Sequence, residues 1–330
     1  ITTGALVFGF IFDFFTLTRI DQVYDNLVFI FHLCVVGVGI IVFNILDTRN
    51  GKGSFAQYVH ILLPTVMQFS FGGLFSGISI FYLRSATISV NIIFIAILFV
   101  LLIGNEFLRE KYTRLVFQVT MYYFALFSYV SLATPLVTET IGAGTFLLGG
   151  VLSVIIIEIF LLVFSKVVRH KFIEVKKDLF LVIGGVFLSM NILYFANIIP
   201  PIPLSLKHID PYYSVMRSGD DYIVERVDKF WNPFDTIYIR ESQPVYVFIS
   251  IFSPTKIDAR IYHHWQYFDK KEGKWISAGR IGYEIVGGRD GGFRGYTRKS
   301  NVFPGRWRVD VETERRQLIG RETFNIKYVD

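Results

Sequence analysis

The 330-residue chain has one cysteine, four methionines and little charge for its length. The single cysteine, Cys34, cannot form an intrachain disulfide, and it has no neighbouring ligand residues that would indicate a metal site. The chain has no Lys and Arg tract long enough to indicate nucleic-acid binding, so we expect no nucleic-acid partner. Charged residues make up 18% of the chain and hydrophobic residues 52%, which is more apolar than a typical soluble domain.

The charge is concentrated in the C-terminal third of the chain. Residues 1–206 contain 12 Lys and Arg and 10 Asp and Glu, whereas residues 207–330 contain 21 and 17. This contrast indicates two domains in different solvents. Between them, Pro200, Pro201 and Pro203 cannot continue a helix. We therefore predict a transmembrane domain over residues 1–199, a proline-rich exit linker over 200–220 and a water-exposed domain over 221–330.

Seven apolar runs approach the length of about 20 residues that a helix needs to cross a bilayer. They cover residues 1–15, 24–46, 58–82, 86–104, 115–134, 143–165 and 179–199. A backbone in lipid must satisfy its own hydrogen bonds, so we expect these runs to be helical. Only Arg84 separates the third run from the fourth, so this pair is a tight hairpin or its limits differ. The prediction is an α-helical polytopic membrane domain of about seven transmembrane helices.

Lys and Arg are distributed unequally between alternate connections of these runs. The second, fourth and sixth connections contain ten such residues, whereas the first, third and fifth contain only Arg19 and Arg84. The ten are Arg49, Lys52, Arg109, Lys111, Arg114, Lys166, Arg169, Lys171, Lys176 and Lys177. Positively charged loops stay in the cytoplasm, so seven spans place the C-terminal domain outside. We therefore predict a multi-pass protein of the bacterial inner membrane with its C-terminal domain in the periplasm.

Glu158 is the central ionisable residue of the membrane domain, in the run IIIEIFLLVF. Charged residues inside spans often mark substrate or proton paths. A path normally has several ionisable groups at one depth, so a helix–helix hydrogen bond is the favoured alternative. The same alternative applies to His32, Asn44, His60 and Asn91, which lie near span ends or on faces of small residues.

Eight short strand-like runs follow the linker. Along residues 306–313, Trp307 and every second residue after it are apolar or Thr, and the residues between them are charged, which is typical of a half-buried strand. The runs are DYIVERV, DTIYIRE, PVYVFISIF, DARIYHHWQYF, KWISAGRIGYEIV, FRGYTRKS, RWRVDVET and LIGRETFNIKYV. They predict a C-terminal all-β, immunoglobulin-like sandwich of antiparallel strands. The expected inward residues are Val247, Ile249, Ile261, Trp265, Ile281, Trp307, Val309 and Phe324.

Three segments of this domain resemble segments of a known bacterial protein family. They are VYVFISIFSPTKIDARIYHHW, GGRDGGFRGYTRKS, and PGRWRVDVET followed by LIGRETFNI. Together they resemble a bacterial family of proteins of unknown function, family 2914, whose members have His-x-Trp, matched here by His263 and Trp265. The family's Pro-Gly-x-Trp-Arg-Val-x-Val-x-Thr element, which includes Trp307 and Arg308 here, is the most specific part. The resemblance implies an envelope location and a small β-domain behind membrane helices, and it implies no activity.

His263 and His264 are adjacent on a predicted strand and therefore face opposite sides, so they cannot easily bind one metal ion. We expect His263 to face the core and to form a hydrogen bond with a backbone group. The serines lack the Gly-x-Ser-x-Gly element of an activated nucleophile, and the carboxylates form no readable pair. We therefore expect no metal, no cofactor and no enzymatic activity.

The stretch GGRDGGFRGYTRKS combines glycines with Arg289, Arg294, Arg298 and Lys299. A phosphate-binding loop needs a helix behind it, and no helix follows, so we expect a wide hairpin or a bulge. The four cations are candidates for one edge that binds carboxylate or phosphate groups. A solvated arginine face without a ligand is the alternative.

The leading hypothesis is a non-enzymatic inner-membrane protein whose periplasmic β-sandwich binds an envelope partner, as a scaffold or an accessory subunit of a membrane complex. Besides the lipid bilayer, the partner is a membrane or periplasmic protein, an anionic glycan or a lipid headgroup. The alternative is a transporter or lipid-handling protein that uses the sandwich as receptor or gate. A polar path through the helices distinguishes the two, and Glu158 is the residue to mutate.

Overall fold

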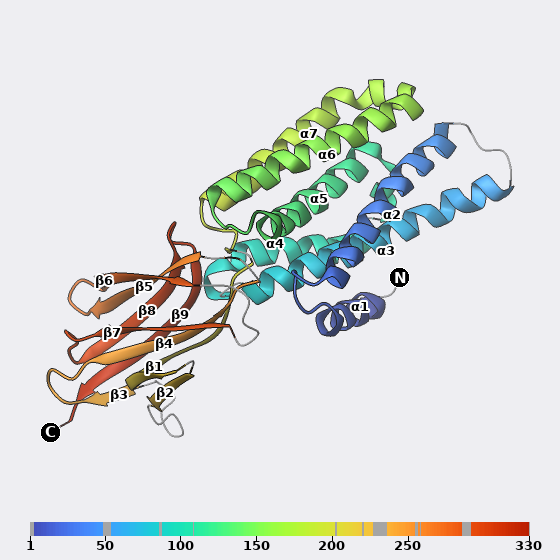
Figure 1. Ribbon diagram of the computed structural model, residues 1–330. Coiled ribbons are helices and arrows are strands. Elements are labelled where there is room, and N and C mark those ends of the chain that lie inside the picture. The colour runs from blue at the N-terminus through green and yellow to red at the C-terminus, as the bar shows by residue number, and fades with distance from the viewer. Residues whose placement is uncertain are drawn as a thin grey trace. The chain divides into compact units, whose positions relative to one another are not determined.

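A computed structural model describes residues 3–48, 54–85, 88–107, 109–201, 203–219, 221–226, 236–254, 257, 259–285 and 292–329. The chain divides into a helical unit and a β unit, with the main boundary between Ile199 and Pro200. Figure 1 shows the helices in blue to green and the strands in yellow to red.

The helical unit contains seven α-helices among the described residues. They are α1 (Thr3–Thr16), α2 (Val23–Thr48), α3 (Ser54–Ser85), α4 (Ile88–Phe107), α5 (Leu115–Thr138), α6 (Ala143–Val167) and α7 (Arg169–Phe195), with a 3₁₀ helix over Arg109–Thr113. In the described part of the chain, α2, α3, α5, α6 and α7 are long and apolar enough to cross a membrane. The apolar parts of α1 and α4 are shorter, Val7–Thr16 and Ile92–Asn105. Five of the seven predicted spans are therefore helices with the length and composition to cross a membrane, and seven transmembrane helices are not confirmed.

Helix α7 begins earlier than its apolar run. We expected residues 166–178 to form a loop, but only Val168 separates α6 from α7, and the charged residues 169–178 form the first turns of α7. Lys, Arg and Glu have high helix propensity, so a helix continues through a charged stretch that is too polar for the hydrocarbon core. The hydropathy of the sequence locates the apolar run that begins at residue 179, whereas the helix begins ten residues earlier at Arg169.

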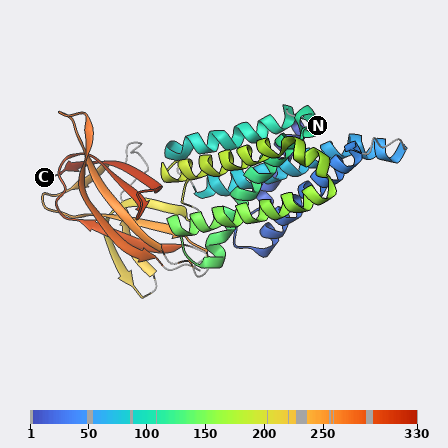
Figure 2. The same ribbon diagram turned by 90° about the horizontal axis from the view of Figure 1, so that it is seen from above.

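Helix α5 is the most buried of the five long helices. Its most apolar stretch of 18 residues is 78% buried, whereas the corresponding stretches of α6 and α7 are 33% and 22% buried. It packs against α2, α6 and α7, and Figure 2 shows the helices of this unit running alongside one another. Ile159 on α6 and Leu181 on α7 are more than half exposed. Broad exposed apolar faces of this kind suit contact with lipid.

The β unit contains nine strands among the described residues. They are β1 (Ser205–Ser218), β2 (Asp221–Arg226), β3 (Thr236–Ile239), β4 (Val245–Phe252), β5 (Ala259–Asp269), β6 (Lys274–Ile285), β7 (Phe293–Lys299), β8 (Gly305–Thr313) and β9 (Leu318–Tyr328). The eight predicted strands are all present. The ninth, β1, occupies most of the segment that we expected to be a linker, residues 200–220. Its sequence includes Pro211, and proline within a run argues against a central strand.

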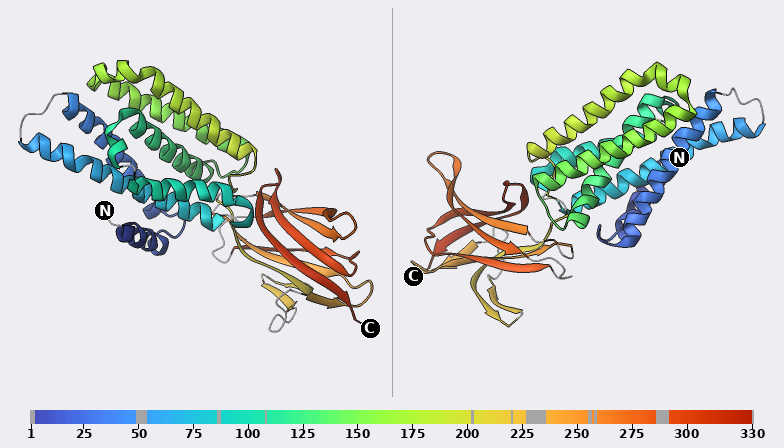
Figure 3. Two further views of the ribbon diagram at one scale, coloured as in Figure 1. Left: turned by 180° about the vertical axis from the view of Figure 1, so that it is seen from behind. Right: turned by 45° about the horizontal axis from the view of Figure 1, so that its top comes forward.

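The strands form two sheets, β2-β1-β4-β7 and β3-β9-β8-β5-β6 (Figure 3). Neighbouring strands are antiparallel except β3 and β9, which pair in parallel, so the sandwich is not purely antiparallel as expected. One core lies between the sheets and includes Val247 and Ile249 from one and Trp265, Trp307 and Val309 from the other. The predicted inward residues are buried, with the exception of Ile281, which is 37% exposed because it lies on the edge strand β6.

Candidate functional site

Strand β8 presents a charged side and an apolar side, as its sequence predicts. Trp307, Val309 and Val311 are fully buried in the core. On the other side Asp310 and Glu312 face outward, yet they are only 5% and 4% exposed. Side chains from neighbouring strands cover them and form a continuous network on the outside of the five-stranded sheet. We call this network the polar face; it consists of Tyr262, His264, Gln266, Trp275, Arg280, Arg306, Arg308, Asp310, Glu312 and Arg321.

Asp310 is the centre of the first half of the polar face. Arg321 on β9 binds it through two hydrogen bonds, Nε to Oδ1 at 2.5 Å and Nη2 to Oδ2 at 2.8 Å. Gln266 on β5 donates from Nε2 to Oδ2 at 3.0 Å. The bond from Asp310 is the main reason that the pKa of Arg321 is raised. A charge-assisted fork of this kind fixes both position and orientation, so β5, β8 and β9 are joined outside the core as well as inside.

Glu312 is the centre of the second half. It accepts a hydrogen bond from Arg280 Nε at 2.7 Å, and Arg280 Nη2 also donates to the carbonyl oxygens of Thr313 and Glu314. The Arg280 guanidinium lies 3.7 Å from the centre of the Tyr262 ring, a cation–π contact. Nε, Nη2 and one face of the Arg280 guanidinium are therefore engaged within the fold.

Arg308 differs from the other two arginines because its hydrogen bonds go to a neutral acceptor. Its Nε and Nη2 donate to Gln266 Oε1 at 3.2 and 2.7 Å, and its guanidinium lies 4.4 Å from the Trp275 ring centre. Arg306 lies over the same ring at 5.6 Å. Burial and the positive charges of Arg321 and Arg306 lower the pKa of Arg308, against the opposing effect of Asp310.

The polar face thus has an excess of positive charge. Arg280, Arg306, Arg308 and Arg321 make four guanidinium groups, whereas Asp310 and Glu312 make two carboxylates. Arg321 and Arg280 form hydrogen bonds with the two carboxylates. Arg306 and Arg308 lie beside the Trp275 ring. Guanidinium forks bind carboxylate and phosphate groups well. The arrangement is chemically suited to an anionic group.

The cations predicted from the glycine-rich stretch do not form one cluster. Arg294 and Arg298 alternate with Tyr296 on one side of β7, and Arg294 pairs with Asp221 at 2.9 Å. Lys299 points to the other side and donates to the Ala278 carbonyl at 2.6 Å. Arg289 lies outside the described residues. The structure therefore places Arg294 and Arg298 on one side of β7, with Tyr296 between them, and Lys299 on the other side.

His263 lies in the core, fully buried, as expected from its side of β5. Its partners are side chains and not the backbone group that we expected: Nδ1 lies 2.8 Å from Thr297 Oγ1, and Nε2 lies 2.8 Å from the Tyr283 hydroxyl. Trp265 Nε1 also donates to Thr297 Oγ1. Burial lowers the pKa of His263 to about 3. Among the described residues no group of His, Cys, Asp and Glu could hold a metal ion.

In the helical unit, the polar residues singled out from the sequence have different surroundings. Glu158 is exposed on the surface of α6, and no hydrogen bond joins it to another described residue. Asn44 is buried and donates to Gln118 Oε1 on α5 at 2.9 Å, which is a helix–helix hydrogen bond.

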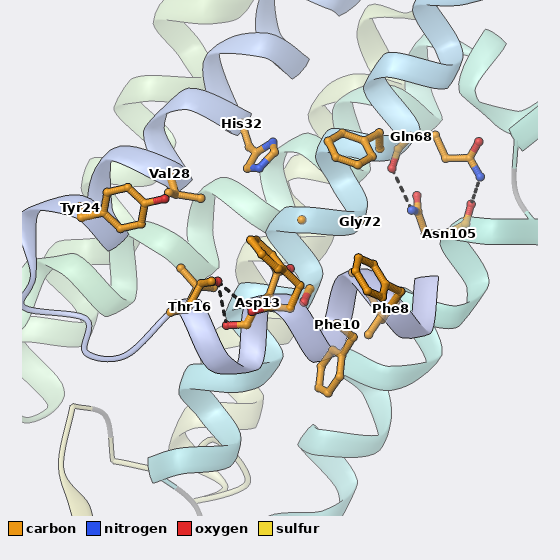
Figure 4. A pocket seen from close by; sticks show the side chains of 17 residues that line it. Phe8, Phe10, Asp13, Thr16, Tyr24, Val28, His32, Gln68, Gly72 and Asn105 are labelled. Carbon is orange, nitrogen blue, oxygen red and sulfur yellow. Dashed lines mark hydrogen bonds between the residues drawn. The ribbon is translucent and has the colours of Figure 1, made fainter. Parts of the chain in front are cut away.

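A pocket of about 520 Å³ lies instead between α1, α2, α3 and α4 (Figure 4). Its polar lining includes Asp13, His32 and Ser76. Sequence reasoning did not select Asp13, although a carboxylate in the apolar run GFIFDFF was a usable signal.

Residues 258–326 match the family described as protein of unknown function DUF2914. The match follows the helical region and confirms the resemblance seen in the sequence. It runs from β5 into β9 and contains every residue of the polar face. No curated protein matches the chain.

Three solved structures show a distant likeness. An immunoglobulin-like protein of Pseudomonas aeruginosa is 13% identical, with 38% of this chain and 96% of that chain covered and a TM-score of 0.22. A β-glucosidase of Listeria innocua is 12% identical, with coverages of 40% and 18% and a TM-score of 0.21. The alkylpurine DNA glycosylase AlkC of Pseudomonas fluorescens is 8% identical, with coverages of 94% and 99% and a TM-score of 0.24. TM-scores this low say nothing about function.

Proposed function

We propose that this protein is a non-enzymatic protein of the bacterial inner membrane, whose β unit lies in the periplasm and binds an envelope partner that carries anionic groups. The helical unit anchors the β unit, and the whole acts as a scaffold or an accessory subunit of a membrane complex. The observation that carries the proposal is the pair Arg306 and Arg308 at Trp275, because neither guanidinium forms an ion pair with a carboxylate among the described residues.

The network beneath this pair supports a binding role. Arg308 is held in place by Gln266, and Gln266 is held by Asp310, which Arg321 fixes in turn. Guanidinium groups that are already oriented lose less side-chain freedom when a ligand binds. The hydrogen bonds therefore preorganise the outer side of the sheet for binding. Arginines that are only solvated would have no such hydrogen bonds to orient them.

The distribution of positive charge supports the orientation. Helix α4 runs over 20 residues, about 30 Å at 1.5 Å per residue, so we take all helices from α2 to α7 as spans. The Lys- and Arg-rich connections α2–α3, α4–α5 and α6–α7 then lie on one side, which the charge rule makes the cytoplasm. The β unit follows α7 and lies on the opposite side whether or not α1 crosses.

The test is copurification of the full-length protein from native membranes in a mild detergent. We expect Arg306→Gln/Arg308→Gln to lower the yield of the bound partner at least tenfold, because rim charges control encounter and salt dependence. The same pair replaced by lysine should recover only part of the yield, since lysine keeps the charge but lacks the fork.

Two control variants remove equal charge elsewhere in the β unit. Lys271→Gln/Lys327→Gln alters exposed cations outside the polar face, and Arg294→Gln/Arg298→Gln alters the β7 arginines. Full partner yield in the Arg306 and Arg308 variant would refute the polar face as the binding surface. Loss of the bound partner only in the Arg294→Gln/Arg298→Gln variant would show that the partner binds at the edge strand β7 and not at the polar face.

A further inference from the structure

The pocket between α1, α2, α3 and α4 is open to the surroundings of the helical unit. Three of its lining side chains are largely exposed: Phe12 by 59%, Tyr24 by 64% and Phe69 by 66%. In a membrane-spanning unit, exposed apolar side chains of this kind face the hydrocarbon of the bilayer. A volume of about 520 Å³ lies within the range of small-molecule sites, roughly 300–1,000 Å³. A ligand that enters from the bilayer must carry apolar surface.

Part of the polar lining is already satisfied by the fold. Gln68 Nε2 donates to the Asn105 carbonyl at 3.0 Å, and Asn105 Nδ2 donates to the Gln68 carbonyl at 3.0 Å. Thr16 Oγ1 donates to the Phe12 carbonyl at 2.9 Å. The Gln68–Asn105 pair joins α3 to α4, and the Thr16 bond lies within α1, so these groups do not need a ligand.

Asp13, His32 and Ser76 also line the pocket, and Figure 4 labels Asp13 and His32 there. The Ser76 hydroxyl interacts with the Asp13 carboxylate. The Nδ1 atom of His32 is buried and has no hydrogen-bond partner among the described residues. No cationic side chain in the described part of the chain pairs with Asp13. A buried polar atom without a hydrogen bond and a half-buried carboxylate without a cation are both costly. His32 Nδ1 and the Asp13 charge therefore indicate that a ligand completes the site.

The His32 ring is held in place by a close approach to α3. A Cβ atom at Gly73 would lie 2.9 Å from His32 Nε2, so the imidazole packs closely against the backbone of α3 at this glycine and would have to shift for a larger residue. The rings of Phe31 and Phe69 lie beside it, with centroids at 5.5 and 6.2 Å. A histidine positioned so closely is suited to recognise one ligand group.

We propose that this pocket binds an amphipathic amine, with its hydrocarbon chain along Phe8, Phe12 and Phe69 and its ammonium group at Asp13. The remaining ammonium protons are available to His32 and Ser76. A half-buried carboxylate is best completed by a cation, and aromatic ring faces attract ammonium groups as well as chains. The amine is either the headgroup of a phospholipid such as phosphatidylethanolamine or a free alkylamine. This site is separate from the function proposed for the β unit and does not depend on it.

The experiment compares photocrosslinking of the full-length protein in mild detergent by three probes with the same diazirine-bearing sixteen-carbon chain. The probes are an alkylamine, the corresponding alcohol and a phosphatidylethanolamine. We expect the amine to label peptides containing Phe12 or Phe69 at least tenfold more efficiently than the alcohol. Labelling by phosphatidylethanolamine at the same peptides identifies the source as a lipid headgroup, and labelling by the alkylamine alone identifies a free amine.

Two variants separate headgroup recognition from the apolar pocket. Asp13→Asn should reduce labelling by the amine to the level of the alcohol, because it removes the charge and keeps the shape. Gly72→Leu should abolish labelling by all probes, since its Cβ has space, with Asn105 Nδ2 at 3.4 Å, and the larger side chain fills the pocket. The control is Gly185→Leu on α7, where nothing lies within 4 Å of an added Cβ.

Two results would overturn the proposal. One is equal labelling of the wild type by the amine and the alcohol, and this comparison needs no variant to fold. The other is labelling that persists in Gly72→Leu at the wild-type level. Size-exclusion chromatography of each variant shows whether its fold is intact.

Discussion

At the residue scale, two tryptophans of the β unit have opposite roles. Trp307 on β8 is fully buried, and its Nε1 donates to the Phe303 carbonyl at 2.9 Å. Trp275 on β6 is partly exposed and lies under the guanidinium groups of Arg306 and Arg308. The same side chain therefore serves the core at one position and the surface at the other.

Trp307→Ala should unfold the β unit or leave it barely stable. Truncating a buried tryptophan costs about 3–5 kcal/mol, out of the roughly 5–15 kcal/mol of a typical domain. The measurement is protease resistance of the full-length protein during heating. Trp275→Ala is the control and should shift the midpoint much less; an unchanged midpoint in Trp307→Ala would show that β8 is not a core strand.

His263 should make the β unit sensitive to acid. Burial lowers the pKa of His263 to about 3, whereas an exposed histidine has a pKa of about 6.5. Between these values the unfolded chain binds more protons, so stability is present above about pH 6.5 and is lost as the pH falls toward 3. From pH 7 to pH 5 the loss should be about 2 kcal/mol, at 1.36 kcal/mol per pKa unit.

The check is urea unfolding at both pH values for His263→Gln and for the control His264→Gln. The first variant should lack this part of the pH dependence and the second should keep it, since His264 lies on the outer side of the same strand, with Nε2 at 2.9 Å from Ser277 Oγ. Identical pH profiles for all three proteins would contradict the assignment.

At the scale of elements, β5, β8 and β9 are joined on both sides of their sheet. The inner side packs Trp265, Val309 and Phe324 in the core. The outer side links Gln266, Asp310 and Arg321 by hydrogen bonds. Because adjacent side chains of a strand face opposite ways, one sequence supplies both the core and the polar face.

Asp310→Asn should destabilise the sheet by about 1.5–3 kcal/mol, the range for hydrogen bonds to charged groups, because Arg321 loses its fork. A double-mutant cycle with Arg321→Gln measures the coupling. The control pair is Glu272 and Lys274, which lie 2.6 Å apart but are 53% and 64% exposed. Exposed pairs contribute about 0–1 kcal/mol, so equal coupling in the two pairs would show that burial of Asp310 is unimportant.

At the scale of the whole molecule, the order of charged and apolar segments determines the proposed orientation. A cysteine at Ser300, which is exposed, should react with a membrane-impermeant thiol reagent on intact spheroplasts. A cysteine at Lys177, exposed near the start of α7, should react only after lysis. Both variants need Cys34→Ser, because Cys34 is the free thiol of the chain. Protection at residue 300 with labelling at residue 177 would reverse the topology.

Much of the fold was predictable because it depends on local periodicity. Apolar runs located the helices, and alternation located eight strands and the burial of His263 and Trp307. Strand β1 was not predicted, because Pro200, Pro201 and Pro203 indicated an exit linker. Pairing with β2 and β4 stabilises this strand although it contains Pro211. The early start of α7 was not predicted because hydropathy locates the apolar part of a helix and not its charged first turns.

The sites were less predictable than the fold. Lys299 was grouped with Arg294 and Arg298 by sequence proximity, but alternation along β7 directs it to the other side, where it meets the Ala278 carbonyl. Trp275 and Arg306 are 31 positions apart and meet only because β6, β5 and β8 are neighbours in one sheet.

The sequence alone determined a protein of two parts, the apolar helices, the strand pattern and the family resemblance of the β unit, because each depends on the kind and spacing of nearby residues. Only the tertiary structure decided that Asp310 and Glu312 are buried beneath arginines, that Arg306 and Arg308 share Trp275, and that Asp13 and His32 line one pocket. These features join residues from different strands and helices, and strand order and helix packing determine which of them meet.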